Sequence, residues 1–103
     1  MSGSGANAAR GEAALSVGGE TLVLRPSFEA LVAAEEELGP LFALVERAAE
    51  GRLTVKEMAA LFWHCAGAPG VARERIGAAI AEMGLAGVAP VLKRLLGQIL
   101  QGR

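Results

Sequence analysis

The most apolar stretch of the chain covers residues 54–67 and carries hydrophobic residues at helical spacing on almost every side. One stripe has the i, i+3, i+4, i+7 spacing of a buried helix face and consists of Met58, Leu61, Phe62 and Cys65. A second stripe beside it consists of Ala59, Ala60, Trp63 and Ala66. Thr54 and Glu57 have the S/T-x-x-E spacing of a capping box at the helix start, and Gly67 supplies a stop. A helix that is apolar around most of its circumference is usually central, so we expect the other elements to pack on it.

Two short alternating runs near the N-terminus predict a β-hairpin. They flank Gly18 and Gly19, a dipeptide that suits a two-residue turn. With these two glycines as the loop, Val17 faces Glu20 and the leucine side of the hairpin should be buried. That side consists of Ala13, Leu15, Val17, Leu22 and Leu24. Because a lone hairpin is marginal in water, this one must lie on a helix or extend into a sheet with another copy.

Two helices are predicted between the hairpin and the central helix. The first covers residues 28–38, where Ser27 can cap the start and Gly39 with Pro40 ends the helix. Its spacing predicts an inner side of Phe28, Leu31, Val32 and Leu38. The second begins after Pro40 and stops at Gly51. Its predicted inner side is Leu41, Leu44, Val45 and Ala48.

Two more helices are predicted after the central one. The first covers residues 71–83, with an inner side of Ile76, Ala79, Ile80 and Met83. Gly84 and Gly87 are predicted to bracket a break, and Pro90 to occupy the first turn of the final helix. The final segment has the most regular apolar spacing, at Val88, Val91, Leu92, Leu95, Leu96, Ile99 and Leu100. The fold class is therefore α+β, mainly α: an N-terminal β-hairpin followed by four or five short helices in one small domain.

Length and charge restrict the organisation and the partners. The 103 residues fit one domain, and we expect a disordered tail at residues 1–10 and a single domain at 11–103. A net charge of −1 gives no general electrostatic reason to bind nucleic acid or an anionic membrane. The start lacks the apolar core of a signal peptide, and no apolar run is long enough to span a bilayer. Together with the lone cysteine, this predicts a cytoplasmic protein.

The sequence contains few of the residue types that catalytic sites usually need. All 11 acidic residues are glutamates, and the chain has one histidine and one cysteine, which are neighbours. His64 and Cys65 diverge on a helix, so they form neither a catalytic dyad nor a zinc site, which needs about four ligands. Glu35, Glu36 and Glu37 point about 100° apart and predict a solvated face. No glycine-rich phosphate motif is present, and we predict no catalytic residue, no cofactor and no metal.

A partner-binding surface is the best functional hypothesis from the residues. The aliphatic side of the final helix exceeds what a terminal helix in so small a domain readily hides, although simple core packing remains open beside a partner groove or a dimer seam. Trp63 has the same two interpretations, because tryptophan is enriched at interaction hot spots. The predicted contact residues are Phe62, Trp63, Leu92, Leu95, Leu96 and Ile99.

Three segments in succession resemble a known family. They read G-E-A-A-L-S-V-G-G-E-T-L-V-L-R, then S-F-E-A-L-V-A-A-E-E-E-L-G, then L-T-V-K-E-M-A-A-L-F-W-H-C-A-G. The clearest marks are the end of the hairpin at Leu24-Arg25 and the glycine, Gly51, before the helix start at Leu53-Thr54. A third is the acidic run followed by Leu-Gly that ends the first helix, at Glu35, Glu36, Leu38 and Gly39. From about Gly11 onward the chain is similar to the small gene transfer agent family proteins, which are related to tail assembly chaperones of long-tailed phages. Gly77, Gly84 and Gly87 depart from the pattern by making the later part unusually glycine-rich.

The resemblance implies a non-enzymatic role in building a phage-like tail, encoded in a gene transfer agent or prophage cluster. A chaperone of this kind coats apolar helices of the tape-measure protein in the bacterial cytoplasm until tube subunits polymerise. The resemblance also implies a homo-oligomer as one form of the protein. The alternative is a structural tail component retained in a virion-like particle. Family descriptions also use the words "tail tube protein", although a tube-forming subunit is mainly β. A third hypothesis, from another class, is a small regulator or toxin-type enzyme with His64 as its base.

Overall fold

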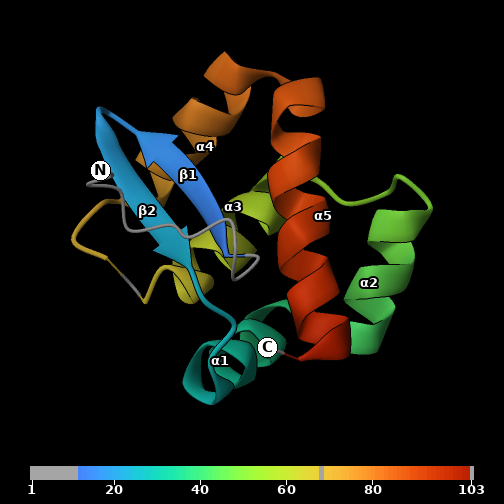
Figure 1. Ribbon diagram of the computed structural model, residues 1–103. Helices are drawn as coiled ribbons and strands as arrows, with labels where there is room; N and C mark the ends of the chain where they lie inside the picture. The colour runs from blue at the N-terminus through green and yellow to red at the C-terminus, as the bar shows by residue number, and fades with distance from the viewer. Residues whose placement is uncertain (1–11, 68, 103) are drawn as a thin grey trace.

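The arrangement of strands and helices follows the sequence-based prediction closely (Figure 1). The computed structural model describes residues 12–67 and 69–102, so the predicted tail at residues 1–10 lies outside the described residues. The elements are β1 (Ala13–Val17), β2 (Glu20–Leu24), α1 (Phe28–Leu38), α2 (Leu41–Ala49), α3 (Val55–Cys65), α4 (Arg73–Met83) and α5 (Leu85–Gln101). The α+β, mainly α fold class is therefore confirmed.

Helix α3 lies at the centre of the fold, as its apolar circumference predicts. The capping box is present: the backbone N–H of Glu57 donates to Thr54 Oγ1 at 3.1 Å, and the backbone N–H of Thr54 donates to Glu57 Oε1 at 3.0 Å. Helices α1 and α4 pack against α3, and the N–H of Arg25 donates to the carbonyl of Cys65 at 2.8 Å. The buried residues of α3 are Met58, Ala59, Ala60, Leu61, Phe62 and Cys65.

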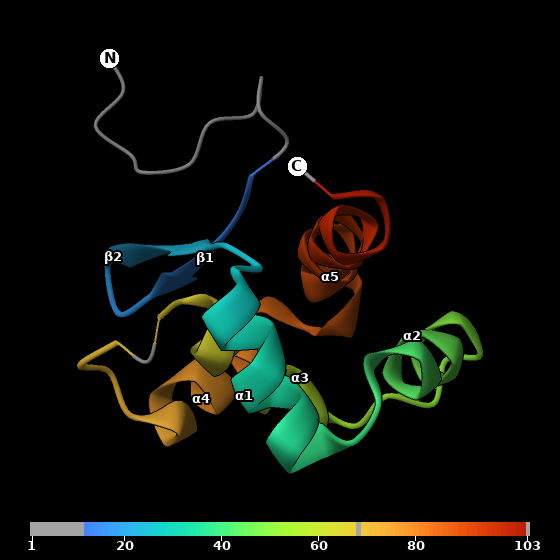
Figure 2. The ribbon, with the colours of Figure 1, turned by 90° about the horizontal axis from the view of Figure 1, so that it is seen from below.

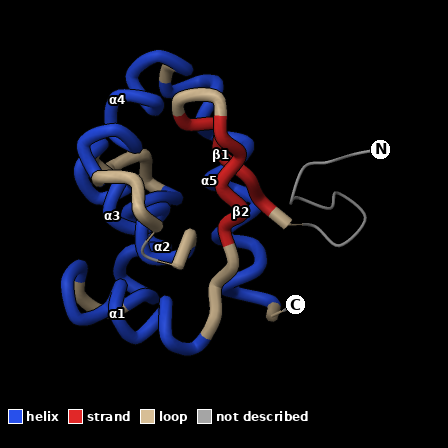
Figure 3. The backbone as a smooth tube through the Cα atoms, turned by 90° about the vertical axis from the view of Figure 1, so that its left-hand side faces the viewer, coloured by secondary structure: helices blue, strands red, loops and turns tan. Residues whose placement is uncertain are grey.

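The hairpin has the predicted turn and register. Gly18 and Gly19 have φ angles of 56° and 86°, and Val17 pairs with Glu20 across the turn. Helices α4 and α5 pack against β1 and cover its apolar side (Figure 3). On that side Ala13, Leu15, Val17 and Leu24 are buried, and Leu22 is partly buried. The helices thus supply the support that an isolated hairpin would lack.

The inner side of α1 differs from the prediction. Phe28 and Val32 were expected to point inward, but their side chains are exposed, and Ala30 and Ala34 are buried instead. The reason is the close packing of α1 on α3. A side with alanines lets two helix backbones approach, so α1 turns Ala30 and Ala34 toward α3 and leaves Phe28 and Val32 in solvent.

The predicted break after α4 is present, but it is confined to Gly84 and does not extend to Gly87. Gly84 has a φ of 80° and ends α4, and α5 begins at the next residue and continues through Gly87. Pro90 lies inside α5 rather than in its first turn, where it has no N–H to donate to the carbonyl four residues earlier. One left-handed residue is enough to turn the chain, so α5 begins about one turn earlier than predicted.

Within the described residues, no single helix has the length and apolarity needed to cross a membrane. Taken as one segment, α4 and α5 meet the length and composition criterion, but they are bent by 119° at the break between them.

Candidate protein-binding site

An apolar groove is lined by residues of α1, α2 and the C-terminal end of α5. Figure 2 shows how these three helices are arranged. The volume of the groove is about 210 Å³. The residues that line it are Leu31, Glu35, Leu41, Phe42, Val45, Ile99 and Leu100. Two of these residues come from α1, the next three from α2 and the last two from α5. The surface therefore joins two consecutive helices to the distant C-terminal helix.

Large apolar side chains surround this groove and remain in solvent. Phe42 is 82% exposed and Leu100 is 56% exposed. Phe28 and Val32, which are 82% and 39% exposed, lie one helical turn from Leu31 and Glu35 on the same side of α1. A cluster of exposed apolar residues, as opposed to single scattered ones, marks an interaction site on a protein surface. We refer to the lining residues together with Phe28 and Val32 as the α1–α2–α5 groove.

The one charged residue in the lining has a structural role. Glu35 Oε2 accepts a hydrogen bond from the backbone N–H of Leu41 at 3.1 Å, and Leu41 is the first residue of α2. The carboxylate therefore satisfies a free N–H and lies at the positive end of the α2 dipole. This contact fixes α2 relative to α1, and it holds the two walls of the groove together.

The six residues chosen from the sequence are only partly at this surface. Phe62 and Leu95 are fully buried in the core, so a partner that binds this conformation cannot touch them. They are buried because both lie at the centre of their helices' packed sides. Leu92 and Leu96 pack on the core and are partly buried, and Ile99 lines the groove. Binding by Leu92, Leu96 and Ile99 stays a prediction.

Sequence reasoning missed Phe42, Leu31 and Leu100 as binding candidates. One signal was present: Phe42 falls outside the predicted inner stripe of its helix, which leaves an aromatic residue with no core position. Phe28 gave no such signal, because it fitted the apolar stripe that was predicted to face inward. In the structure this residue is exposed.

The side chain of Trp63, on α3, contacts the segment before α4. Its Nε1–H donates to the carbonyl of Val71 at 3.1 Å, and the Arg73 guanidinium lies 4.4 Å from the centre of the indole ring. This is cation–π geometry. Trp63 is partly buried, and its polar and aromatic contacts are both intramolecular. A structural role therefore explains its position, and its role in binding remains a prediction.

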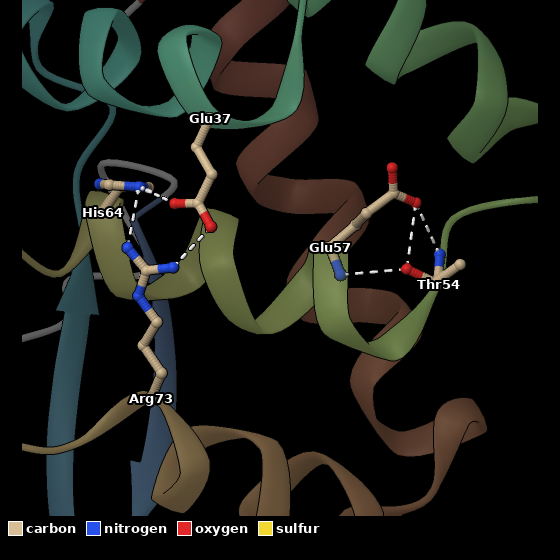
Figure 4. Close-up of polar contacts among 5 residues, drawn as sticks. All are labelled: Glu37, Thr54, Glu57, His64 and Arg73. Atoms are coloured by element: carbon tan, nitrogen blue, oxygen red, sulfur yellow. Dashed lines mark hydrogen bonds and ion pairs between the residues drawn. The ribbon is translucent and has the colours of Figure 1, made fainter.

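A polar cluster beside Trp63 links three helices (Figure 4). Glu37 of α1 accepts from Arg73 of α4 at 2.6 Å and contacts His64 Nε2 of α3 at 2.8 Å. The hydrogen bond from Arg73, followed by the one from His64, holds the pKa of Glu37 below its ordinary value despite partial desolvation. Of the three consecutive glutamates, Glu37 alone reaches this cluster, so the predicted divergence of their side chains is confirmed.

His64 and Cys65 do not form a reactive pair. His64 Nε2 faces Glu37 on the surface of α3, whereas the Cys65 side chain points into the core. Burial raises the pKa of the Cys65 thiol to about 12. Among the residues that the structure describes, no three His, Cys, Asp or Glu side chains gather in a way that could hold a metal ion.

The Glu37 cluster predicts a specific dependence of stability on acid. Because the pKa of Glu37 is lowered on folding, its contribution is complete above the ordinary glutamate value of about 4.3 and is lost as pH falls through the lowered value. Glu37→Gln should lower the free energy of unfolding by about 0.2–1 kcal/mol at pH 7, a small amount because the pair is partly exposed. The difference from wild type should shrink below about pH 4.

Urea unfolding at a series of pH values measures this difference. Glu36→Gln is the matched control, because the ion pairs of the described residues include Glu37 and do not include Glu36. An equal and pH-independent effect of both substitutions would contradict the role given to the cluster.

The fold and the groove define a small, mainly helical domain with a cluster of exposed aromatic and aliphatic side chains. A family model described as "Phage tail tube protein, GTA-gp10" matches residues 10–102. Since the match covers nearly the whole chain, the chain belongs to this gene transfer agent family of phage tail proteins. The family resemblance seen in the sequence is confirmed at that level. The comparison with curated proteins gives no match, and neither does the comparison with solved structures.

Proposed function

We propose that this chain is a structural, non-enzymatic component of a phage-like tail that stays in the assembled particle. The observation that carries the proposal is the match of residues 10–102 to a family described as a tail tube protein. The α1–α2–α5 groove supports it, because a structural component needs surfaces that hold its neighbours. The contacts would be with other tail proteins and with further copies of the chain.

The same features support protein partners over other classes of partner. A net charge of −1 provides no general attraction to nucleic acid or to an anionic membrane. The groove is lined by aliphatic and aromatic side chains around one glutamate that already caps α2. A surface of this kind gains free energy by excluding water from apolar side chains, which is the usual contribution of another protein.

A tail assembly chaperone is the second candidate, and the helical fold favours it. A subunit that builds a tube is mainly β, whereas this fold has only one two-stranded sheet among its described residues. In this alternative the groove covers apolar helices of the tape-measure protein in the bacterial cytoplasm, and the chain leaves before the tail is complete. The two candidates thus differ in where the protein is found after assembly.

Quantitative mass spectrometry of purified particles separates the two candidates. The proposal predicts this chain at a fixed ratio to the other tail proteins in intact particles. If the chain is required for tail formation but missing from purified particles, the structural role is wrong and the chaperone role stands. A particle that assembles fully after deletion of the gene would exclude both.

A further inference from the structure

We infer that the α1–α2–α5 groove binds the apolar face of an amphipathic α-helix whose flanks carry lysine or arginine. The inference rests on the proposed function and adds the chemistry of the partner segment. Three features of the groove lead to it: its small volume, the absence of a sheet edge from its helical walls, and the acidic residues at its margin.

The volume of the groove suits side chains of a protein partner. At about 210 Å³ it is smaller than the range of roughly 300–1,000 Å³ in which small-molecule sites fall. Phe28 and Phe42 stand in solvent beside it, each 82% exposed. Exposed aromatic residues around a shallow apolar groove are typical of helix-in-groove recognition, where a few side chains from one face of a helix enter the groove.

The walls of the groove favour a helical partner over an extended one. All three walls are helices, whose backbone N–H and C=O groups are bonded within each helix except near the ends. The groove therefore offers no sheet edge for an extended segment. An extended partner would lose water from a whole row of its own backbone groups and could gain bonds only at the few helix-end groups, whereas a helix satisfies its backbone groups internally.

The margin of the groove favours a basic partner. Glu36 lies one turn from Val32, and Glu46 lies one turn from Phe42, and both are exposed. Neither forms an ion pair within the described part of the chain. Arg47, the basic residue next to Glu46, is engaged by Glu57 at 2.6 Å on another side of α2.

The rest of the groove contains little positive charge that would offset these glutamates. Helix α1 has four glutamates and no lysine or arginine. The basic residues of α5, Lys93 and Arg94, come about two turns before Leu100, on the order of 10 Å along the axis. Lysine or arginine on the flanks of a bound helix would meet unpaired carboxylates, and glutamate there would be repelled.

Two synthetic peptides test the inference directly. Both have 18 residues and the same leucines at i, i+3, i+4 and i+7 spacing, but one has lysine and the other glutamate on its flanks, and both carry a fluorophore. In fluorescence anisotropy at low salt, the lysine peptide should bind at least about tenfold more tightly than the glutamate peptide. The difference should shrink at high salt, because the rim charges are exposed to screening.

Variants locate the binding. Phe42→Ser should weaken binding of the lysine peptide by at least about tenfold. The variant should fold, because the side chain of Phe42 is largely exposed. Leu85→Ser is the matched control: Leu85 is 61% exposed and lies at the opposite end of α5, so it should leave binding unchanged. Glu36→Gln combined with Glu46→Gln should remove most of the preference for the lysine peptide.

Three outcomes would overturn the inference. These are equal affinity for the two peptides, unchanged binding by a folded Phe42→Ser protein, and a groove already closed by a second copy. The last would appear in sedimentation as a dimer that Phe42→Ser dissociates and that excludes the peptide. None of these results changes whether the chain is present in purified particles, so a failure here is distinct from a failure of the proposed function.

Discussion

Phe62→Ala is expected to lower the free energy of unfolding by about 3–5 kcal/mol. Phe62 is 0% exposed and lies at the centre of α3, the helix on which α1 and α4 pack. Truncation removes the buried ring and leaves a cavity that packed helices fill only in part. Since a domain of this kind has a total stability of about 5–15 kcal/mol, the variant should be close to unfolding. Urea unfolding followed by circular dichroism measures the change.

Phe42→Ala is the control for this prediction, because it removes the same side chain from a position that is 82% exposed. Its effect on stability should stay within about 0.5 kcal/mol, while its effect on partner binding should be large. Similar losses of stability at the two positions would contradict the division between core and groove. The pair also tests the correction to the sequence-based contact set, which chose Phe62 and omitted Phe42.

The parts of the fold that could be predicted depend on residues that are close together in the sequence. The capping box of Thr54 and Glu57 needs only a spacing of three, and the register of the hairpin follows from a two-residue turn. The strict alternation of β1 then decides which side is buried. In these places the local rules and the tertiary structure agree, so the sequence was sufficient.

The orientation of α1 could not be predicted in the same way. Its large apolar residues and its alanines form two different stripes, and spacing alone favours the larger side chains. The packing partner of α1 determines which stripe is buried. Helix α3 comes so close that Ala30 and Ala34 fit between the two helices, whereas Phe28 does not. This orientation also creates the groove, because it places Leu31 and Glu35 beside residues of α2 and α5.

The polar cluster and the groove need contacts between residues far apart in the chain. Glu37 and Arg73 are 36 positions apart, and nothing in their local sequence pairs them. Of the six predicted contact residues, Ile99 alone lines the groove. Periodicity found the aliphatic side of α5 correctly, but it could not show that Val88 and Leu95 are buried in the core while Leu100 is exposed at the C-terminal end.

Native Cys65 is expected to react with a thiol reagent at pH 8 about three orders of magnitude more slowly than the unfolded chain. Burial raises the pKa of its thiol to about 12, so the thiolate fraction at pH 8 is on the order of 10⁻⁴. An ordinary cysteine, with a pKa of about 8.5, is roughly one quarter thiolate at that pH. Exclusion of the reagent from the core slows the native protein further. Reaction with 5,5′-dithiobis(2-nitrobenzoic acid), with and without denaturant, measures the ratio.

The same raised pKa predicts how stability changes in alkali. The folded state favours the neutral thiol, so its contribution is complete below about pH 8.5 and is lost as pH rises from there toward the folded value. Cys65→Ala removes this titration, and its stability should fall less than that of wild type above about pH 9. Rapid modification of the native protein, or parallel alkaline curves for the two proteins, would show that the thiol is accessible and ionised. Either result would contradict the burial of Cys65 in the core.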